Sequence, residues 1–307
     1  MGKYLVTGGC GFVGSHLVDA LCAYEHSVRI LDDLSTGLAV LRPPGVELIV
    51  GNVADPSLVA QSMRGIDGCF HLAAVASVEQ SNGDWLGTHR TNLTGTVTVL
   101  DAATRARFNC PIPVVFASSA AVYGDPLDIP ISERTAPRPL SAYGADKLGS
   151  ELHCYVASHV HRVPTCSLRF FNVYGPRLSP DSAYSGVISI FCDRLKNGDA
   201  ITVYGDGRQT RDFIYVGDVV RALLAAMGKC SLDGDILNVC TGTATTIGGL
   251  AMTIGDLLGT KPDIAFGPAR EADVGNSVGD PSKAQDVLGF SASIDLATGL
   301  ALTLAEA

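Results

Sequence analysis

Three regularly spaced glycines constrain the fold of this chain more than any other feature. Gly8, Gly11 and Gly14 lie where a short apolar run, residues 3–7, meets a helical apolar pattern over residues 12–24. Glycines at such a junction permit a tight turn, close approach of the backbone to a pyrophosphate and close helix–strand packing, while the helix N-terminus attracts the anion. The spacing predicts a dinucleotide-binding turn. A glycine turn that binds no ligand is the alternative.

Two acidic residues after the next apolar run support that prediction. Residues 27–31 have the pattern of a second strand, which is followed by Asp32 and Asp33. A carboxylate at this place accepts hydrogen bonds from an adenosine ribose and repels a 2′-phosphate, so it favours NAD over NADP. An aspartate that only caps a turn is the alternative. Together with the glycine turn, the acidic pair predicts NAD as the cofactor.

The first half of the chain alternates strand-like and helix-like segments. Continuous apolar strands that alternate with helices indicate a parallel sheet covered on both faces. The expected strands are residues 3–7, 27–31, 46–51, 68–72, 114–118 and 165–171, and the expected helices are residues 12–24, 56–63, 88–105 and 142–159. The predicted fold class is therefore α/β, with a doubly wound parallel Rossmann sheet.

The alternation changes after residue 171. The expected elements are then a long Pro- and Ser-rich loop at 176–185, a helix at 186–196, buried strands at 211–215 and 235–239, and helices at 246–259 and 283–288. We expect residues 1–171 to form the NAD-binding domain, with segments near 213–240 crossing back to it. Residues 172–307 are expected to form a smaller C-terminal substrate-binding part.

The composition argues against several classes of protein. The net charge of the 307 residues is −9, whereas a nucleic-acid interface requires a basic face. No apolar run approaches the roughly 18 residues of a membrane span, and no signal peptide precedes the first strand pattern. Nine scattered cysteines without a C-x-x-C pair are expected to be reduced thiols in a cytoplasmic protein. We expect no nucleic acid, no membrane and no metal as partners.

A tyrosine and a lysine four residues apart provide the first candidate for catalysis. Tyr143 and Lys147 lie in a segment expected to be helical, so their side chains share one face. An ammonium and a nicotinamide cation nearby favour the phenolate, and lowering the usual tyrosine pKa of about 10 by about 3 units requires roughly 4 kcal/mol. Ser119, after the strand expected at 114–118, can hydrogen-bond the same substrate oxygen. An amphipathic helix with an ordinary surface lysine is the alternative.

Further motifs extend the pattern over almost the whole chain. They are the glycine turn, residues 32–37, residues 71–74, Asn92, residues 118–124, 143–147, 168–177 and 204–213. With these motifs the chain resembles the extended short-chain dehydrogenase/reductase family, and within it the NAD-dependent nucleotide-sugar 4-epimerases. The resemblance implies that Tyr143 takes the proton of the sugar 4-hydroxyl as the C4 hydride passes to NAD. The transient 4-keto sugar then turns, and hydride returns to its opposite face.

The resemblance also implies binding roles for individual residues. The cofactor would contact Gly8, Gly11, Phe12, Val13, Gly14, Asp32, Asp33, Leu34, Ser35, Thr36, Gly37, Asn52, Val53, Leu72, Ala73, Ala74, Ala76, Asn92, Ser118, Tyr143, Lys147 and Phe171. The UDP-sugar would contact Ser119, Tyr143, Asn172, Gly186, Val187, Thr202, Val203, Tyr204, Arg211, Arg270, Asp273 and Ser277. For Arg211, a structural ion pair with Asp212 or Asp218 is the alternative. Residues 172–307 would thus form the nucleotide-sugar-binding domain.

Two departures from the family pattern concern the cofactor. Asn52 stands where the family commonly has an aspartate that touches the adenine, and Ala76 stands where some members carry a lysine. The first departure is expected to soften the selectivity for the base. The second implies that part of the phosphate clamp differs.

The residues after Ser119 bear on the type of reaction. Ala120 and Ala121 stand where related 4,6-dehydratases carry an acid pair and sugar-acid decarboxylases carry a carboxylate. Without an acid, elimination lacks its general acid/base, so the resemblance favours a 4-epimerase. The alternatives are a net oxidoreductase or dehydratase acting on a nucleotide sugar, and a non-catalytic NAD-sensing protein.

The resemblance also bears on the sugar and on assembly. In similar epimerases a bulky residue at the position of Ser277 blocks N-acetylated sugars. Serine therefore predicts that UDP-N-acetylglucosamine and UDP-N-acetylgalactosamine fit alongside UDP-glucose and UDP-galactose, while a UDP-uronic acid stays open. A homodimer is expected, in which the helices at 88–105 and 142–159 form a bundle between subunits.

Overall fold

The structure is a computed structural model that describes residues 1–106, 110–178, 186–269 and 274–306. Seven parallel strands form its main sheet. The strand order is β11-β6-β5-β4-β1-β2-β3. The strands are β1 (Lys3–Thr7), β2 (Ser27–Asp32), β3 (Glu47–Val50), β4 (Gly68–His71), β5 (Val114–Ser119), β6 (Thr165–Phe170) and β11 (Asp235–Val239). The order reverses between β1 and β4, the place where doubly wound sheets bind their ligands. The predicted fold class is confirmed.

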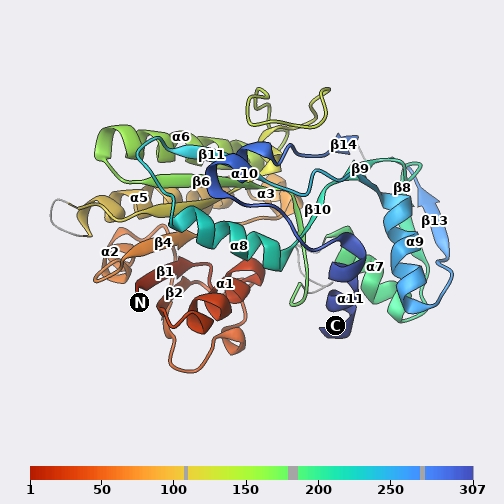
Figure 1. Cartoon of the computed structure of the whole chain (residues 1–307), viewed down its shortest axis with the longest axis horizontal. Coiled ribbons are helices and arrows are strands. Elements are labelled where there is room, and N and C mark those ends of the chain that lie inside the picture. Colours follow the sequence, from red (N-terminus) through yellow and green to blue (C-terminus); the bar gives the residue numbers. More distant parts are fainter. Residues whose placement is uncertain (107–109, 179–185, 270–273, 307) are drawn as a thin grey trace.

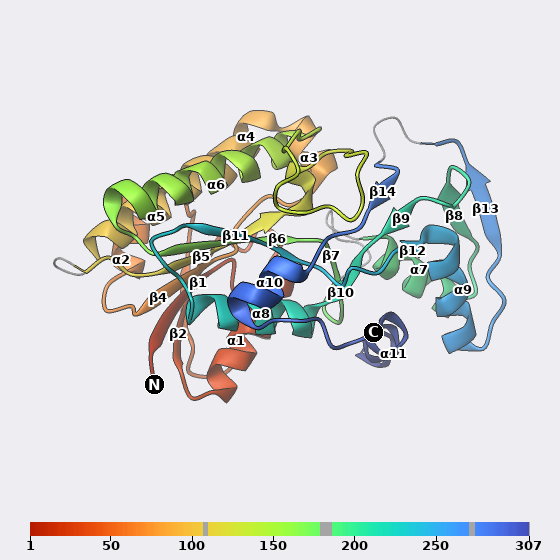
Figure 2. The ribbon, with the colours of Figure 1, turned by 45° about the horizontal axis from the view of Figure 1, so that its top comes forward.

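Helices cover both faces of this sheet (Figures 1 and 2). On one face, α1 (Phe12–Ala23), α8 (Val216–Met227) and α10 (Ser282–Leu288) share one hydrophobic cluster with the strands. On the other face, α2 (Pro56–Ser62), α5 (Gly95–Arg105) and α6 (Ala142–His161) share a second cluster. The strands are buried on both sides, which explains why their sequences are continuously apolar. The sequence had indicated α1, α2, α6 and α10 but not α8.

The helix expected at residues 88–105 is interrupted. It begins earlier, as α4 (Trp85–His89) after the short α3 (Val78–Gly83), passes through one turn of π-helix at Arg90–Thr94 and continues as α5. Within the π turn, the side-chain amide of Asn92 accepts a hydrogen bond from the Val75 N–H and donates one to the Val75 carbonyl. The wider turn thus brings Asn92 inward to hold the loop after β4.

The strand expected at 211–215 is also divided. β9 (Thr210–Arg211) pairs with β12 (Thr245–Thr246) and β14 (Asn276–Ser277), whereas β10 (Phe213–Tyr215) pairs with β7 (Asn172–Tyr174). Asp212 lies between them. Its buried carboxylate accepts hydrogen bonds from the backbone N–H groups of Thr241, Gly242 and Gly279. These tertiary contacts turn the chain between the two sheets.

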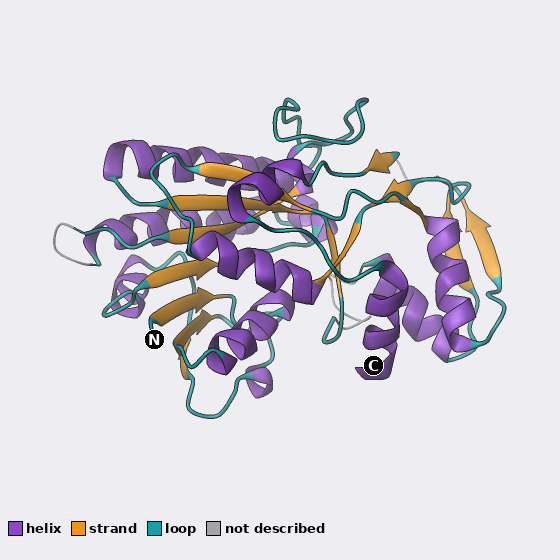
Figure 3. Cartoon of the chain, in the orientation of Figure 1, coloured by secondary structure: helices purple, strands orange, loops and turns teal. Residues whose placement is uncertain are grey.

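A smaller set of elements packs beside the main sheet (Figure 3). It contains α7 (Val187–Lys196), β8 (Ile201–Tyr204), α9 (Ile247–Leu258), β13 (Ile264–Gly267) and α11 (Leu296–Glu306), and it has a hydrophobic cluster of its own. Sequence reasoning missed α11 and the β8–β13 pair. The chain between residues 213 and 240 returns to the main sheet, where β11 is a strand paired with β6 and α8 packs against one face. In the described part of the chain, no helix is long and apolar enough to cross a membrane.

Candidate active site

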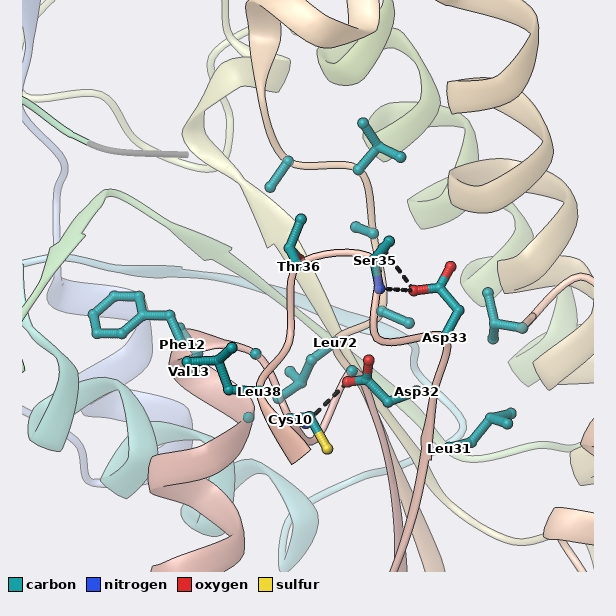
Figure 4. A pocket seen from close by; sticks show the side chains of 18 of the residues that line it. Cys10, Phe12, Val13, Leu31, Asp32, Asp33, Ser35, Thr36, Leu38 and Leu72 are labelled. Carbon is teal, nitrogen blue, oxygen red and sulfur yellow. Dashed lines mark hydrogen bonds between the residues drawn. The ribbon is translucent and has the colours of Figure 1, made fainter. Parts of the chain in front are cut away.

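A cavity of about 740 Å³ lies at the carboxyl ends of β1, β2 and β4 (Figure 4). Its size suits a cofactor. Predicted cofactor residues make up much of its lining: Gly8, Gly11, Phe12, Val13, Gly14, Asp32, Asp33, Ser35, Thr36, Val53, Leu72, Ala73, Ala74 and Ala76. The sequence therefore identified most of this cavity from four segments that the parallel sheet brings together.

Two positions of the glycine turn, Gly8 and Gly14, leave no room for a side chain. Gly8 has a φ of +70°, and a Cβ added to it would lie 2.8 Å from the Ala73 nitrogen. A Cβ on Gly14 would lie 2.1 Å from the Gly8 carbonyl oxygen. Gly11 is the N-cap of α1 and brings no side chain to cap that helix. The first backbone amides of α1 are thus available to an anion such as a pyrophosphate, so this end of the cavity fits a dinucleotide.

Asp32 ties two of the cavity loops together. Its carboxylate accepts a hydrogen bond from the Cys10 N–H at 2.9 Å (Figure 4) and another from the Leu34 N–H at 2.9 Å. Burial raises the pKa of Asp32, and the two amide donors act against that shift. Asp33 accepts from both the N–H and the hydroxyl of Ser35. Asp32 therefore shapes the turn, as the alternative reading held, and it also lines the cavity where a ribose would bind.

Several predicted cofactor residues do not line the cavity. The Asn52 side chain accepts a hydrogen bond from the Ala54 N–H at 2.8 Å, and the Asn92 side chain forms the two hydrogen bonds to Val75 described above. The Ser118 hydroxyl donates a hydrogen bond to Glu151 at 2.5 Å. Phe171 is buried in a hydrophobic cluster. Gly37 packs against Cys10, and Leu34 bonds to Asp32 through its backbone. These residues shape the walls of the site.

The structure gathers the proposed catalytic side chains at the end of β5. Ser119 is the last residue of β5, and Tyr143 and Lys147 lie on α6, which packs against that strand. The Lys147 ammonium donates to the Ala117 carbonyl at 2.7 Å and lies 5.7 Å from the centre of the Tyr143 ring. The Ser119 hydroxyl accepts from Ala121 N–H at 3.1 Å. Tyr143 and Lys147 therefore share one face of the helix, as their spacing predicted.

Lys147 is not a surface lysine, since only 3% of it is exposed. Burial lowers its pKa from 10.5 to about 8. An ammonium that stays charged near neutral pH beside a tyrosine stabilises the phenolate form of that tyrosine. The arrangement is chemically suited to removing a proton from a substrate alcohol.

Three predicted substrate residues come together from distant parts of the chain. Asn172 begins β7 and is the register partner of Phe213 in β10, while Arg211 in β9 is the register partner of Ser277 in β14. The guanidinium of Arg211 donates to the Thr210 carbonyl at 2.9 Å. The alternative partners named for Arg211 make other bonds: Asp212 binds backbone amides, and Asp218 pairs with Arg221.

The remaining predicted substrate residues fall into three groups. Gly186 caps α7, and Val187 is the first residue of that helix. Thr202 and Tyr204 lie on the exposed face of β8, but Val203 is 1% exposed and packs into a hydrophobic cluster. Strand alternation turns the Val203 side chain inward, so the predicted role of this segment beside the base stays a prediction that would involve the Val203 backbone rather than its side chain. Arg270 and Asp273 lie outside the described residues.

Comparison with known proteins assigns the family. The chain matches the NAD dependent epimerase/dehydratase family over residues 4–240. It belongs to this family. The resemblance to nucleotide-sugar epimerases is thereby confirmed, and so is NAD as the cofactor, because the family depends on it.

Individual members of the epimerase/dehydratase family cover nearly the whole chain. A putative UDP-glucose 4-epimerase of Methanocaldococcus jannaschii is 35% identical over 96% of this chain and 95% of its own length. The structure of a UDP-glucose 4-epimerase of Thermotoga maritima with UDP-glucose has a TM-score of 0.94, 32% identity and coverage of 99% and 98%. A Thermus thermophilus UDP-glucose 4-epimerase in complex with NAD has a TM-score of 0.91, 34% identity and coverage of 99% and 98%.

Sequence reasoning did not assign some cavity residues to the cofactor, although they lie within the glycine turn and the motif at residues 168–177. Cys10, Val173 and Arg177 line the cavity. Arg177 follows β7 and reaches the cavity because the chain returns there, where its guanidinium pairs with Asp19 of α1 at 2.7 Å. It stood in the motif at 168–177, but the motif did not indicate that it faces the cofactor end of α1.

Proposed function

We propose that this chain is a 4-epimerase of UDP-sugars. The observation that carries the proposal is the buried Lys147 ammonium, 5.7 Å from the centre of the Tyr143 ring and on a helix packed against the strand that ends in Ser119. These are the groups needed to hold and deprotonate a sugar hydroxyl. None of the three lines the described cavity, but β5, which Ser119 ends, is the parallel neighbour of β4, at whose carboxyl end the cavity lies, and the family depends on NAD.

In the proposed mechanism, each residue of the trio has one task. The Ser119 hydroxyl hydrogen-bonds the 4-hydroxyl oxygen and holds it in line. The Tyr143 phenolate removes the hydroxyl proton, and the Lys147 ammonium stabilises that phenolate. NAD, when bound, supplies the acceptor and then the donor of the C4 hydride. Tyr143 returns the proton to the oxygen after the sugar has turned, so the protein ends each cycle in its starting protonation state.

The nucleotide sugar is proposed to bind through residues 172–307, and NAD through residues 1–171 with the returning segments α8 and β11. Asn172 and Arg211 would contact the diphosphate, together with Arg270, because arginine offers a fork of donors to phosphate oxygens. Gly186, Val187, Thr202 and Tyr204 would surround the base, and Asp273 and Ser277 the sugar. The adjacency of Arg211 and Ser277 in neighbouring strands supports this arrangement.

An epimerase is favoured over related chemistries by the residues that follow Ser119. Ala120 and Ala121 form a short 3-10 turn without an acid, so a dehydratase or decarboxylase lacks its general acid/base there. The second candidate function is decarboxylation of a UDP-uronic acid. It is favoured by the similarity to a UDP-N-acetyl-alpha-D-glucosaminuronate decarboxylase of Bacillus cytotoxicus, which is 30% identical over 98% of this chain. The small side chain of Ser277 supports acceptance of N-acetylated sugars alongside glucose and galactose.

The test is incubation of the purified protein, without added cofactor, with UDP-glucose, UDP-N-acetylglucosamine and UDP-glucuronic acid, followed by chromatographic separation of the epimers. We expect interconversion of each neutral or N-acetylated pair without net NADH. Tyr143→Phe should retain NAD and lose at least about 100-fold in rate. Net release of NADH, carbon dioxide or a 4-keto-6-deoxy sugar would instead identify the alternative chemistries, and unchanged behaviour of Tyr143→Phe would identify a sensor.

We further propose a homodimer in the cytoplasm. Exposed apolar side chains follow the outer face of α6, namely Leu152, Tyr155, Val156 and Val160. An apolar stripe of this kind marks a protein interface, and a second copy could cover it with the same stripe. The nine cysteines are free thiols, which supports a reducing compartment.

A further inference from the structure

Asp146 lies between Tyr143 and Lys147 on α6, and the mechanism above gives it no role. It is 4% exposed. Its Oδ1 lies 2.9 Å from Nδ1 of His89 in α4, while its Oδ2 has no hydrogen-bond partner among the described residues. A buried carboxylate with one oxygen unpaired costs free energy. It therefore calls for a functional explanation.

The charges around Lys147 indicate what Asp146 contributes. Burial lowers the pKa of Lys147, and Cys154, Asp146 and Glu151 act against that shift. Cys154 is a neutral thiol near pH 7, because burial raises its pKa to about 12. Both oxygens of Glu151 bind the guanidinium of Arg169, at 2.8 and 2.6 Å, so the opposite charge offsets its field. Of these three groups, Asp146 alone carries a negative charge that no arginine or lysine of the described residues pairs with, since its partner His89 is charged only when its ring is protonated.

The other titratable groups around this helix face do not replace it. His71 of β4 has a neutral ring, because burial lowers its pKa to about 3. Glu79 of α3, Asp84 before α4 and Arg90 of the π turn are exposed, and water and salt screen their charges. The described strand β5 and the 3-10 turn after it contain no charged side chain.

We propose that Asp146, oriented by His89, is a positioning residue that holds the proton on Lys147 and so sets the pH range in which the Tyr143–Lys147 pair works. The proposal rests on the proposed function, in which this pair handles the sugar proton. Asp146 does not line the described cavity. It acts through Lys147.

The direction of the effect follows from its charge. Tyr143 and Lys147 titrate as a coupled pair, so the two limbs of the pH profile of kcat/KM belong to the pair. Removing a nearby negative charge lowers the proton affinity of both members. Asp146→Asn should therefore move both limbs toward lower pH, by about one pH unit. Because asparagine has the same shape, a purely structural role would lower the rate at every pH and leave the limbs in place.

Matched variants separate charge from shape. Asp146→Ser, which removes the charge with a smaller side chain, should move the limbs as far as Asp146→Asn does. Asp101→Asn removes an exposed carboxylate of α5 and should leave them in place. In the Asp146→Asn background, His89→Gln should add no further movement, because His89 acts through Asp146. If His89→Gln moves the limbs of the pH profile by about one further pH unit, the role of His89 is overturned. If the limbs stay in place in both Asp146 variants, the proposal is overturned.

A second readout needs no turnover. The ultraviolet absorbance of the phenolate, measured in NAD-loaded protein against Tyr143→Phe, titrates the same pair. We expect this titration also to move toward lower pH by about one unit in Asp146→Asn. If the unaltered protein epimerises no sugar while the titration still moves, the proposed function fails and the role of Asp146 stands. If the protein is active and the titration does not move, only the role of Asp146 fails.

Discussion

At the scale of single residues, His71 illustrates how the sheet keeps a titratable ring neutral. It ends β4, and its two ring nitrogens lie 2.7 Å from the Thr7 hydroxyl and 3.0 Å from the Thr96 hydroxyl. Burial, and then the charge of Lys147, lower its pKa to about 3. The hydroxyls satisfy the ring without a carboxylate to favour its cationic form. His71 therefore joins β1, β4 and α5 as an uncharged link.

This neutrality makes the stability of the fold depend on pH. Between about pH 6.5 and pH 3 the unfolded chain protonates His71 and the folded chain does not, so the unfolded state binds more protons and stability falls as pH falls. We expect the free energy of unfolding in urea to drop by about 2 kcal/mol from pH 6.5 to pH 5 on this account. In His71→Gln, this contribution to the fall of the free energy of unfolding between pH 6.5 and pH 5 should be absent. His159→Gln, at an exposed place near the end of α6, should keep it, and equal slopes for both variants would contradict the assignment.

Single residues of the site differ in how far sequence can predict them. The glycine turn was predictable because steric contacts, such as that between a Cβ on Gly14 and the Gly8 carbonyl, leave no other choice of residue. Tyr143 and Lys147 were predictable because a helix places residues four apart on one face. Arg177 was not, because only the path of the chain after β7 brings it to the cavity. The free oxygen of Asp146 was likewise invisible without its neighbours.

At the scale of elements, α6 combines chemistry with support. Its first turns carry Tyr143 and Lys147, and one turn later Glu151 forms a buried ion pair with Arg169 of β6, at 2.6 Å. Glu151 also accepts a hydrogen bond from Ser118, the residue before Ser119. The pair thus fixes α6 against the strand ends that carry the site.

Breaking that pair should cost far more than breaking an exposed one. Glu151→Gln leaves the buried guanidinium of Arg169 without its counter-charge, and we expect a loss of about 3 kcal/mol in the free energy of unfolding. The matched control is Asp101→Asn, which breaks an exposed i,i+4 pair with Arg105 and should cost about 0.5 kcal/mol or less. Urea unfolding at one pH measures both. Similar losses for the two variants would show that the buried pair is not a structural anchor.

Elements also mark where sequence reasoning failed. The strands of the main sheet were predictable because burial on both faces leaves continuous apolar runs. The expected strand at 211–215 was wrong because the amides of Thr241, Gly242 and Gly279, remote in sequence, bind Asp212 and divide it. No local pattern contains those partners. The π turn at Arg90–Thr94 was missed for the same reason, since its cause is the contact of Asn92 with Val75.

At the scale of the whole molecule, the outer face of α6 exposes a row of apolar side chains. Leu152 and Val160 are 62% and 67% exposed there. The opposite face of the same helix packs on the sheet with Cys154 and Ala157. A helix that is apolar on both faces is typical of an element buried by assembly.

The proposed dimer can be measured directly. Light scattering at micromolar concentration should give twice the mass of the chain, and Leu152→Asp with Val160→Asp should give the mass of one chain, because two charges would be buried at the interface. Leu127→Asp is the control, since this residue is 98% exposed and lies on the loop before α6 rather than on the helix face. A single-chain mass for the unaltered protein would refute the dimer.

The position of β11 late in the sequence has a consequence for folding during synthesis. β6 is flanked on one side by β5, but its other neighbour, β11, is encoded some 65 residues further along, at Asp235–Val239. A nascent chain therefore has an open sheet edge at β6 until residues 235–239 have been translated, and open edges attract other strands. Premature termination before residue 235 should yield aggregates rather than a shortened nucleotide binder.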